Sequence, residues 1–526
     1  MTNSIDEIEF TDAIFAIGTN TTENHPVISS KIKRNVRQRG GKLIVADPRE
    51  IDLVKYATIW LRQRPGTDVA LLNGMMNVII SEGLYDKDYV ENRTEGFEEM
   101  KKVVEKYTPE YASKITGVPA EDIKAAARIY GEAKAASILY TMGITQHTTG
   151  VDNVKSIANL AMLCGNVGIE GGGVNPLRGQ NNVQGACDMG ALPVVFTGYQ
   201  PVVSDEARAK FEKAWGVTLP PKPGITIVET LNAAHEGKIK ALYVMGENPM
   251  LSDPDLNHAK ESLGHLDLLI VQDILLTETA QLAHVVLPAA CFAEKDGTFS
   301  NTERRVQMVR KAVEAPGQAK PDWVILAELS TKMGYPMSYA DPEAIMKEIN
   351  ALTPSYAGIT YKRLEKTGIQ WPCPNTDHPG TKFLHQDRFS RGLGLMTAIE
   401  FKPPAEVPDA DYPFVMTTGR VLYQYHTATM SRLSKGIMER CPESLVEIHP
   451  KDAQKLGVAD GQFLKVSSRR GEVQAKSTVT ERVPEGTIFM NFHFHEAAVN
   501  LITNPALDPI AKIPEYKVCA VRVEAA

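Results

Sequence analysis

The chain has 526 residues, and this length predicts three or four domains. Hydrophobic residues make up 43% and charged residues 23% of it, a composition typical of a globular protein with large cores. Its 57 Lys and Arg residues against 64 Asp and Glu residues give a net charge of −7, which argues against a general nucleic-acid-binding protein. No apolar run has the length of a membrane span, and the six cysteines include no C-x-x-C pair, which argues against a disulfide framework and against a thiolate metal site.

The first fifty residues predict a strand, a helix and a second strand. Residues 13–17 form an apolar run that ends at Gly18, and residues 43–46 form another that ends at Asp47. Between them, residues 25–39 carry apolar side chains at helical spacing and are followed by two glycines, which predicts an amphipathic helix with a glycine stop. This order predicts a right-handed βαβ unit with parallel strands. Further helices are predicted at 68–82, 121–134 and 153–164, and another strand is predicted to end within 139–143.

A similar layout recurs later in the chain. An apolar run at 241–245 ends at Gly246, and another at 268–271 is followed by Gln272 and Asp273. In both copies a glycine ends the first strand and a carboxylate follows the second strand. The carboxylate lies 29 positions after the glycine in the first copy and 27 positions after it in the second.

The repeated layout is typical of nucleotide sites. A glycine at a strand end lets a ligand approach the backbone, and the next helix offers free N–H groups to an anion. The carboxylate suits a ribose or a nucleobase amine. Neither copy has the full G-x-G-x-x-G pattern, so each alone is also compatible with an ordinary strand–helix turn. Together they predict two nucleotide-like groups bound pseudo-symmetrically.

The last part of the chain has a different pattern. Short alternating runs at 414–417, 463–466, 472–475 and 488–491 are separated by turn residues, which predicts a β-barrel. A proline-containing acidic stretch within 386–410 predicts the linker into it.

Arg178 stands out in a segment rich in glycine and amide side chains. Three glycines precede it, and the segment 178–190 (RGQNNVQGACDMG) contains a single carboxylate. An arginine held by amides can bind an anion, and its planar fork suits a carboxylate substrate. A buried structural arginine bonded to carbonyl groups is the alternative.

These residues carry a family resemblance that extends over essentially the whole chain. The segment 178–190 resembles the formate-specific version found in catalytic subunits of formate dehydrogenases, within the molybdopterin oxidoreductases of the dimethyl-sulfoxide-reductase type. Supporting matches are 47–49 (DPR), 142–146 (MGITQ), 245–249 (MGENP), 271–273 (VQD), 418–420 (TGR) and 514–517 (PEYK).

The resemblance implies a Mo or W ion held by two molybdopterin guanine dinucleotides, with formate as substrate and CO2 as product. Arg178 would orient formate beside the metal. One dinucleotide would contact Gly18, Asn20, Glu23, Asn24, Asp47, Arg49, Gly66 and Asp68. The other would contact Gly246, Glu247, Asn248, Gln272 and Asp273. Met142, Gln146 and Gln180 would lie near the pterins. The barrel would close over them with Arg420, Gln424, Tyr425, His426, Phe492, His493 and Lys517.

Two features of the barrel segment bear on these assignments. Gln424 stands where relatives often carry His, so its contact departs from the family pattern. His493 and His495 would share one face of a strand, but no third ligand stands nearby in the sequence. We therefore predict no metal site from the residues present.

The family also has an N-terminal segment that finds no match here. It carries four Cys for a [4Fe–4S] cluster, then a selenocysteine or cysteine that ligates the metal, then a His. Our hypothesis is that Met1 is an internal start, chosen because an in-frame UGA for selenocysteine was taken as a stop. The cluster would then belong only to the full-length protein, and this chain alone would be inactive. Its second sheet would be incomplete and would expose an apolar edge.

The predicted fold class is α/β, with two Rossmann-like parallel-sheet domains, pseudo-symmetric nucleotide sites and a C-terminal β-barrel domain. We expect the first domain at 1–179, the second and incomplete one at 180–385, a linker at 386–410 and the barrel at 411–526.

The predicted function is that of a formate dehydrogenase catalytic subunit, expected in the cytoplasm. Its electrons would pass to a partner subunit with further iron–sulfur clusters or a flavin. Neither a nucleic-acid partner nor a transmembrane segment is expected. The alternatives are a molybdopterin oxidoreductase with another small substrate, a cofactor-free structural subunit of a respiratory complex, and an NAD-binding Rossmann protein.

Overall fold

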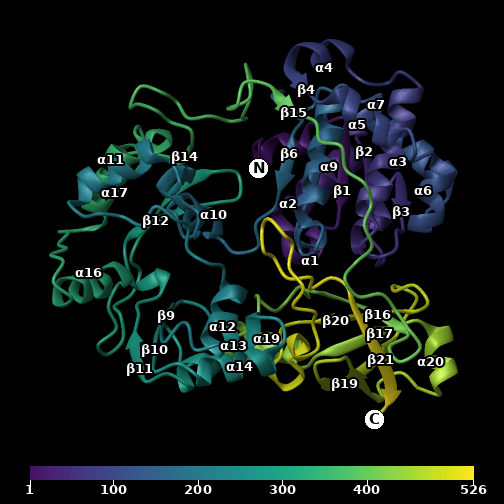
Figure 1. Cartoon of the computed structure of the whole chain (residues 1–526). Coiled ribbons are helices and arrows are strands. Elements are labelled where there is room, and N and C mark those ends of the chain that lie inside the picture. Colours follow the sequence, from purple (N-terminus) through teal and green to yellow (C-terminus); the bar gives the residue numbers. More distant parts are fainter. The chain divides into compact units, whose positions relative to one another are not determined.

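A computed structural model describes all 526 residues, and the chain divides into two compact units (Figure 1). Unit 1 comprises Met1–Gly179, Asp253–Asn257 and Phe383–Ala526, and unit 2 comprises Gln180–Ser252 and His258–Lys382. None of the helices combines the length and the hydropathy needed to cross a membrane.

Unit 1 contains a five-stranded parallel sheet. The strand order is β3-β2-β1-β5-β6, so the chain moves from β1 to one side of the sheet and later adds β5 on the other side. The predicted parallel pairing of the first two strands is confirmed. The strands are β1 (Ala13–Ile17), β2 (Lys42–Ala46), β3 (Ile59–Leu61), β5 (Ala136–Tyr140) and β6 (Val174–Pro176).

Helices cover both faces of this sheet, as a parallel sheet requires. Because side chains alternate along a strand, Phe15 and Ile17 of β1 pack into one core and Ile14 and Ala16 into another. The first core includes side chains of α3, α7 and α9, and the second includes side chains of α2. The helices of this part are α1 (Thr21–Asn24), α2 (Pro26–Arg34), α3 (Asp68–Ser81), α4 (Lys87–Arg93), α5 (Phe97–Val104), α6 (Pro109–Thr116), α7 (Ala120–Gly131), α8 (Met142–Thr145) and α9 (Gly150–Leu163).

The strand predicted to end within 139–143 is β5, which ends at Tyr140 and is followed by the short helix α8. One predicted element differs from its prediction near its end. The helix predicted at 25–39 is regular only to Arg34 and continues as a π-helical turn over Asn35–Arg39. Gly40 then ends it with a φ of 76°, the left-handed conformation that favours glycine.

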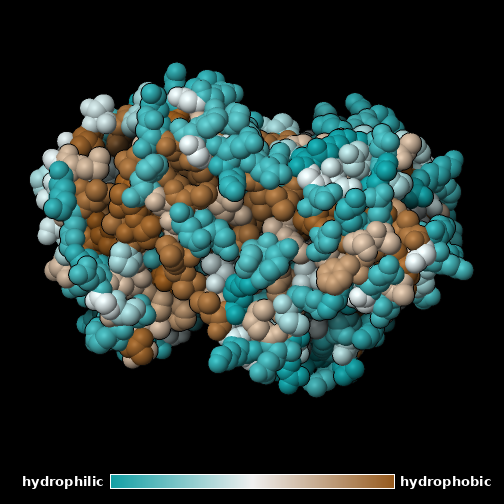
Figure 2. All heavy atoms as spheres, turned by 90° about the horizontal axis from the view of Figure 1, so that it is seen from below, coloured by the Kyte–Doolittle hydropathy of each residue, from teal (hydrophilic) through white to brown (hydrophobic).

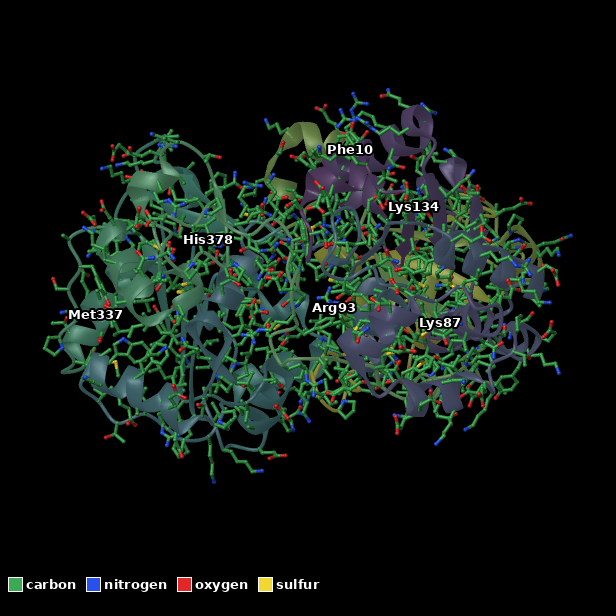
Figure 3. The ribbon with its side chains drawn as sticks, turned by 90° about the horizontal axis from the view of Figure 1, so that it is seen from above. Phe10, Lys87, Arg93, Lys134, Met337 and His378 are labelled. Carbon is green, nitrogen blue, oxygen red and sulfur yellow. The ribbon has the colours of Figure 1, made fainter.

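The segment after Phe383 is fixed to the sheet part of unit 1. Arg93, labelled in Figure 3, lies at the end of α4. It donates a hydrogen bond to the carbonyl oxygen of His385, and its guanidinium lies 5.7 Å from the ring centroid of Phe389. Farther along, β15 (Gly394–Leu395) pairs in parallel with β4 (Thr94–Glu95).

The predicted β-barrel is present in unit 1. Six strands close in the order β16-β20-β17-β19-β18-β21 around a core that includes Met416, Ile448 and Val466. The strands are β16 (Phe414–Gly419), β17 (Leu445–Ile448), β18 (Phe463–Ser467), β19 (Glu472–Val479), β20 (Thr487–Asn491) and β21 (Cys519–Ala525), and the helices are α19 (Lys435–Arg440) and α20 (Pro450–Leu456).

Unit 2 contains the second predicted parallel sheet, with three strands in the order β11-β10-β9. They are β9 (Ala241–Met245), β10 (Leu268–Asp273) and β11 (Val285–Pro288). A small antiparallel sheet joins β12 (Gly297–Ser300), β13 (Arg305–Val309) and β14 (Ile369–Gln370), and a two-stranded ribbon joins β7 (Val195–Phe196) and β8 (Gln200–Pro201). The helices are α10 (Val183–Asp188), α11 (Asp205–Trp215), α12 (Ile227–His235), α13 (Pro249–Ser252), α14 (Leu256–Gly264), α15 (Glu278–Gln281), α16 (Asp322–Lys332), α17 (Pro342–Leu352) and α18 (Tyr361–Leu364).

The sheet of unit 2 is only partly covered. Leu269 and Val271 of β10 pack against side chains of α12 and α14. In contrast, Met245, Val285 and Val286 are 40 to 49% exposed, and Leu276, after β10, is 68% exposed. Apolar side chains gather on the part of the molecule that holds this sheet (Figure 2). Parallel sheets are normally buried on both faces, so the exposure of these apolar side chains is unusual for such a sheet.

Candidate functional site

The centre of the site in unit 1 is the point where the sheet order reverses. Strand β1 ends directly before Gly18, and β5 ends three residues before Gly143. The backbones of these two glycines touch. A Cβ on Gly18 would lie 2.8 Å from the carbonyl carbon of Gly143, and a Cβ on Gly143 would lie 2.5 Å from the carbonyl oxygen of Gly18. Ligands of open α/β sheets bind outside the carboxyl ends of the strands at such a reversal.

A pocket of about 800 Å³, including its open mouth, lies at this reversal and extends to the barrel of unit 1. Eleven of the residues that we predicted for cofactor binding line it. They are Gly18, Asn20, Asn24, Asp47, Arg49, Gly66, Asp68, Met142, Arg420, Phe492 and Lys517. The pocket therefore combines residues at the ends of the parallel strands with residues at the ends of the barrel strands β16, β20 and β21.

Several polar atoms in the wall of this pocket are buried without any partner in the protein. They include both side-chain amide atoms of Asn20, Oδ1 of Asn24, Oε1 of Gln63, and Nε and Nη2 of Arg420. Leaving a buried donor or acceptor unsatisfied costs about 1–3 kcal/mol, more for charged groups. Such groups gathered around one pocket indicate a polar ligand that satisfies them.

Buried charged groups of both signs line the pocket. Burial raises the pKa of Asp47 and of Asp68 to about 6, and the nearby amide of Arg49 opposes this at Asp47. Burial and the charge of Arg420 lower the pKa of Lys517 to about 7. A carboxylate here can accept from a nucleobase amine, and the cations can bind phosphate.

Arg49 is held in place by the barrel. Its Nε donates to Oε2 of Glu447 at 2.6 Å and its Nη2 donates to Oε1 at 2.5 Å. Glu23, which we predicted in the first dinucleotide site, does not line the pocket, but its carboxylate lies 3.8 Å from Nη1 of Arg49. Glu23 is thus placed beside Arg49 rather than in the pocket wall.

Arg178 lies next to this pocket through its neighbour in the chain. It follows β6, and its carbonyl oxygen is 2.7 Å from Nε2 of His25. A Cβ on the next residue, Gly179, would lie 2.7 Å from Nη2 of Arg420. The guanidinium of Arg420, which lines the pocket, therefore packs directly against the backbone beside Arg178.

Four of the predicted barrel residues stand behind the pocket wall. His493 accepts a hydrogen bond from the Val421 amide at 2.9 Å through Nε2, so its Nδ1 carries the proton donated to the carbonyl oxygen of His426. Burial lowers the pKa of His493 to about 4 and keeps the ring neutral. Gln424 donates to the Cys441 carbonyl oxygen at 2.9 Å. These contacts fix the loop after Arg420. The four residues that do not line the pocket are Gln424, Tyr425, His426 and His493.

The two-histidine strand motif that we expected is not formed. Strand β20 ends at Asn491, and His495 belongs to a 3₁₀ turn over His495–Ala497. The two imidazoles therefore do not share a strand face. No group of three or more His, Cys, Asp or Glu side chains in the structure is arranged to hold a metal ion.

In unit 2, the five residues predicted for the second dinucleotide lie at the carboxyl ends of β9 and β10. Gly246 has a φ of 63° and its amide donates to the Gln272 carbonyl oxygen at 2.9 Å. Asn248 donates to Glu278 at 2.8 Å. Burial raises the pKa of Glu247 and of Asp273. The strand ends thus bring these residues together.

The remaining predicted residues lie elsewhere. Gln146 follows α8 and its carbonyl oxygen accepts from the Lys517 amide at 3.4 Å. Gln180 is the first residue of unit 2. Sequence reasoning missed Gln63, His147 and Phe489, which line the pocket, and Glu447. None of these carries a local sequence signal, since each reaches the site only through the fold.

Comparisons with known proteins agree on one family. A family model described as Molybdopterin oxidoreductase matches residues 1–332, and one described as Molydopterin dinucleotide binding domain matches residues 414–520. The F420-dependent formate dehydrogenase subunit alpha of Methanocaldococcus jannaschii is 55% identical, over 100% of this chain and 78% of that protein. Formate dehydrogenase H of Escherichia coli is 42% identical, over 100% and 74%. Acetylene hydratase from Pelobacter acetylenicus has a similar structure, with a TM-score of 0.78 over 99% of this chain and 81% of that chain at 21% identity, which shows the fold alone.

Proposed function

This chain belongs to the molybdopterin oxidoreductase family, and we propose from that premise that it is the catalytic subunit of a formate dehydrogenase. The observation that carries the proposal is the position of Arg178 beside the pocket in which Arg420, Asn20 and Asn24 leave polar atoms without partners. The names of the two relatives described above, both formate dehydrogenases, support the same substrate.

The pocket of unit 1 fits one molybdopterin guanine dinucleotide. The guanidinium N–H groups of Arg420 and the ammonium of Lys517 suit the anionic groups of such a ligand. Asp47 and Asp68 suit the amine of a guanine, and the amides of Asn20 and Asn24 supply further donors and acceptors. When bound, the Mo or W centre of the bis-dinucleotide cofactor accepts the two electrons of formate oxidation.

The residues of the chain bind and orient in this proposal. Arg178 pairs its fork with the carboxylate of formate and so fixes the direction of the C–H bond. Formate then loses one proton and two electrons and leaves as CO2. Arg49 stays paired with Glu447, so it shapes the wall of the pocket rather than binding formate.

The second dinucleotide is proposed for unit 2. Gly246, Glu247, Asn248, Gln272 and Asp273 stand at the ends of parallel strands there, which is the usual place for a nucleotide. Met142, Gln146 and Gln180 remain proposed pterin neighbours, and the domain bounds 1–179, 180–385 and 411–526 remain a proposal as well.

We further propose that the protein acts in the cytoplasm beside an electron-transfer subunit with iron–sulfur clusters or a flavin. The relative from Methanocaldococcus jannaschii is named F420-dependent and is an alpha subunit. By analogy, F420 is the acceptor to which the partner of this chain would pass electrons.

The test uses the protein purified from its own host. Metal analysis should find Mo or W with about two pterins per metal ion, and a dye-linked assay should show formate oxidation. Arg178→Lys should keep the metal and pterin content but lose most of kcat/KM for formate, because one ammonium cannot replace the fork.

Three results would each contradict a part of the proposal. Unchanged formate turnover in the Arg178→Lys protein would remove this residue from the reaction. Protein without metal and pterin would favour a structural subunit, and tight NAD binding without pterin would favour an ordinary Rossmann protein.

A further inference from the structure

His25 connects the pocket loop to Arg178 across 153 positions of sequence. It stands between α1 and α2 and is held by its own backbone, because its amide donates to the Thr21 carbonyl oxygen at 2.8 Å and its carbonyl oxygen accepts from the Ser29 amide at 2.9 Å. Nε2 of its side chain lies 2.7 Å from the Arg178 carbonyl oxygen.

The contact fixes the tautomer of the ring. A carbonyl oxygen can only accept, so Nε2 carries the proton and Nδ1 carries the lone pair. Nδ1 is buried and has no partner in the protein. Burial and the charge of Arg420 lower the pKa of His25, against the effect of the bond to Arg178, so the ring is a neutral donor.

The hydrogen bond from His25 lies directly after the last hydrogen bond between this segment and β5. The amide of Leu177 still donates to the Tyr140 carbonyl oxygen of β5 at 2.9 Å. One residue later, the carbonyl oxygen of Arg178 is held by His25 instead. On the other side of Arg178, Gly179 lies against the guanidinium of Arg420. His25 thus sets the backbone from which the Arg178 side chain extends.

We propose that His25 is a positioning residue that holds Arg178 in the orientation that binds formate. This rests on the proposed role of Arg178. Because His25 directly follows Asn24, and Asn24 and Asn20 line the pocket, His25 also ties the Arg178 backbone to the loop that would contact the dinucleotide. His25 itself does not touch the substrate.

The test compares three substitutions in the enzyme purified from its host. His25→Gln places an amide N–H near the position of Nε2, whereas His25→Asn is too short to reach it and His25→Leu has no donor. Asn73→Leu is the matched control, because Asn73 is also buried in unit 1 and donates one hydrogen bond, at 2.9 Å, to the distant carbonyl oxygen of Ile399.

Two readouts are measured in each protein. Amide hydrogen exchange should become faster in a peptide over 174–183 in the Leu and Asn variants, without a matching change over α2, and His25→Gln should restore it. The KM for formate should rise about tenfold with a smaller change in kcat, which is the effect of losing one hydrogen bond of about 1.4 kcal/mol. Asn73→Leu should change neither readout beyond its overall loss of stability.

The outcomes separate this inference from the function on which it rests. If Arg178→Lys abolishes formate turnover while His25→Leu leaves both exchange and KM unchanged, the positioning role is wrong and the function stands. Faster exchange over α2 in the Leu variant, with 174–183 unchanged, would make His25 a helix-linking residue only and would also end the inference. If Arg178→Lys leaves formate turnover unchanged, the role proposed for Arg178 is wrong, and the positioning role of His25 fails with it, whereas the proposed formate oxidation stands.

Discussion

Arg49 and Glu447 form a two-point ion pair that joins the parallel sheet of unit 1 to its barrel. Both side chains are buried, the two N–O distances are 2.6 and 2.5 Å, and the guanidinium also lies 3.9 Å from the ring centroid of Phe489. Arg49 and Phe489 stand in the wall of the pocket. The pair therefore holds the two parts of the pocket wall in register.

Removing Glu447 should destabilise unit 1 strongly. In Glu447→Ala, Arg49 would keep a buried charge with Glu23 and Asp47 nearby but no carboxylate bound to its guanidinium, which costs about 3–5 kcal/mol of unfolding free energy. Urea unfolding followed by circular dichroism measures this. Glu443→Ala is the control, because Glu443 pairs with Lys476 on the surface at 2.8 Å and should cost less than about 1 kcal/mol. Equal losses in the two variants would contradict the structural role of the buried pair.

Asp68 should make the protein without cofactor less stable as pH rises. Its pKa is about 6 in the folded chain against 3.8 unfolded, because of burial. Between these values the folded chain holds the extra proton, so the free energy of unfolding falls as pH rises through this window. Above pH 6 the deficit is constant at about 3 kcal/mol.

Asp68→Asn should remove that deficit. The free energy of unfolding of the variant should equal that of the native chain near pH 4 and exceed it by up to about 3 kcal/mol at pH 7. The variant should also bind the pterin cofactor less well. Asp52→Asn should behave oppositely, since the hydrogen bond from Lys33 lowers the pKa of Asp52 and its stabilising effect is lost as pH falls. An Asp68→Asn effect that does not change with pH would contradict the assigned burial.

Local sequence patterns predicted the framework of the fold. The apolar runs at 13–17 and 43–46 became β1 and β2 because fully buried parallel strands are continuously apolar. The barrel was equally visible in its short alternating runs. The strand predicted to end within 139–143 is β5, which ends at Tyr140, but the apolar pattern gave no sign of the helical turn at Met142–Thr145 that follows it.

Long-range contacts in the site could not be predicted in the same way. Glu447 is an ordinary strand residue, and only the folded chain brings it to Arg49. The bond from His25 to Arg178 likewise joins segments 153 positions apart. His493 carried a functional prediction from the resemblance, yet both of its ring nitrogens bond to the backbone of its own domain. Only contacts of this kind in the folded chain distinguish a residue that supports the site from a residue that touches the ligand.

Position 179 should tolerate only glycine, because any larger side chain there would clash with Arg420. In Gly179→Ala the new Cβ would lie 2.7 Å from Nη2 of Arg420, so the guanidinium must move and the pocket should retain less pterin. The clash requires the long side chain of Arg420. Adding Arg420→Ala should therefore lower thermal stability and pterin content less in the Gly179→Ala protein than in the native protein. A double-mutant cycle on thermal stability and pterin content measures this coupling.

A matched glycine gives the control for that cycle. Gly264, at the end of α14, has no atom within 4 Å of the position that a Cβ would take, and Gly264→Ala should couple to Arg420→Ala by less than about 0.5 kcal/mol. Additive effects of Gly179→Ala and Arg420→Ala would mean that the two side chains do not compete for space.

The exposed apolar residues at the sheet of unit 2 should cause self-association of this chain when it is made by itself. Leu276 is 68% exposed and Val286 of β11 is 40% exposed, and an uncovered apolar sheet with an open edge strand is a typical aggregation site. Leu276→Glu with Val286→Thr should shift the chain toward monomer in sedimentation velocity, because a charge on this surface opposes stacking. Ile510→Glu is the control, since Ile510 is 66% exposed in unit 1 and its replacement should leave the association unchanged. A native chain that stays monomeric and unfolds in one cooperative transition would show that this surface needs no cover.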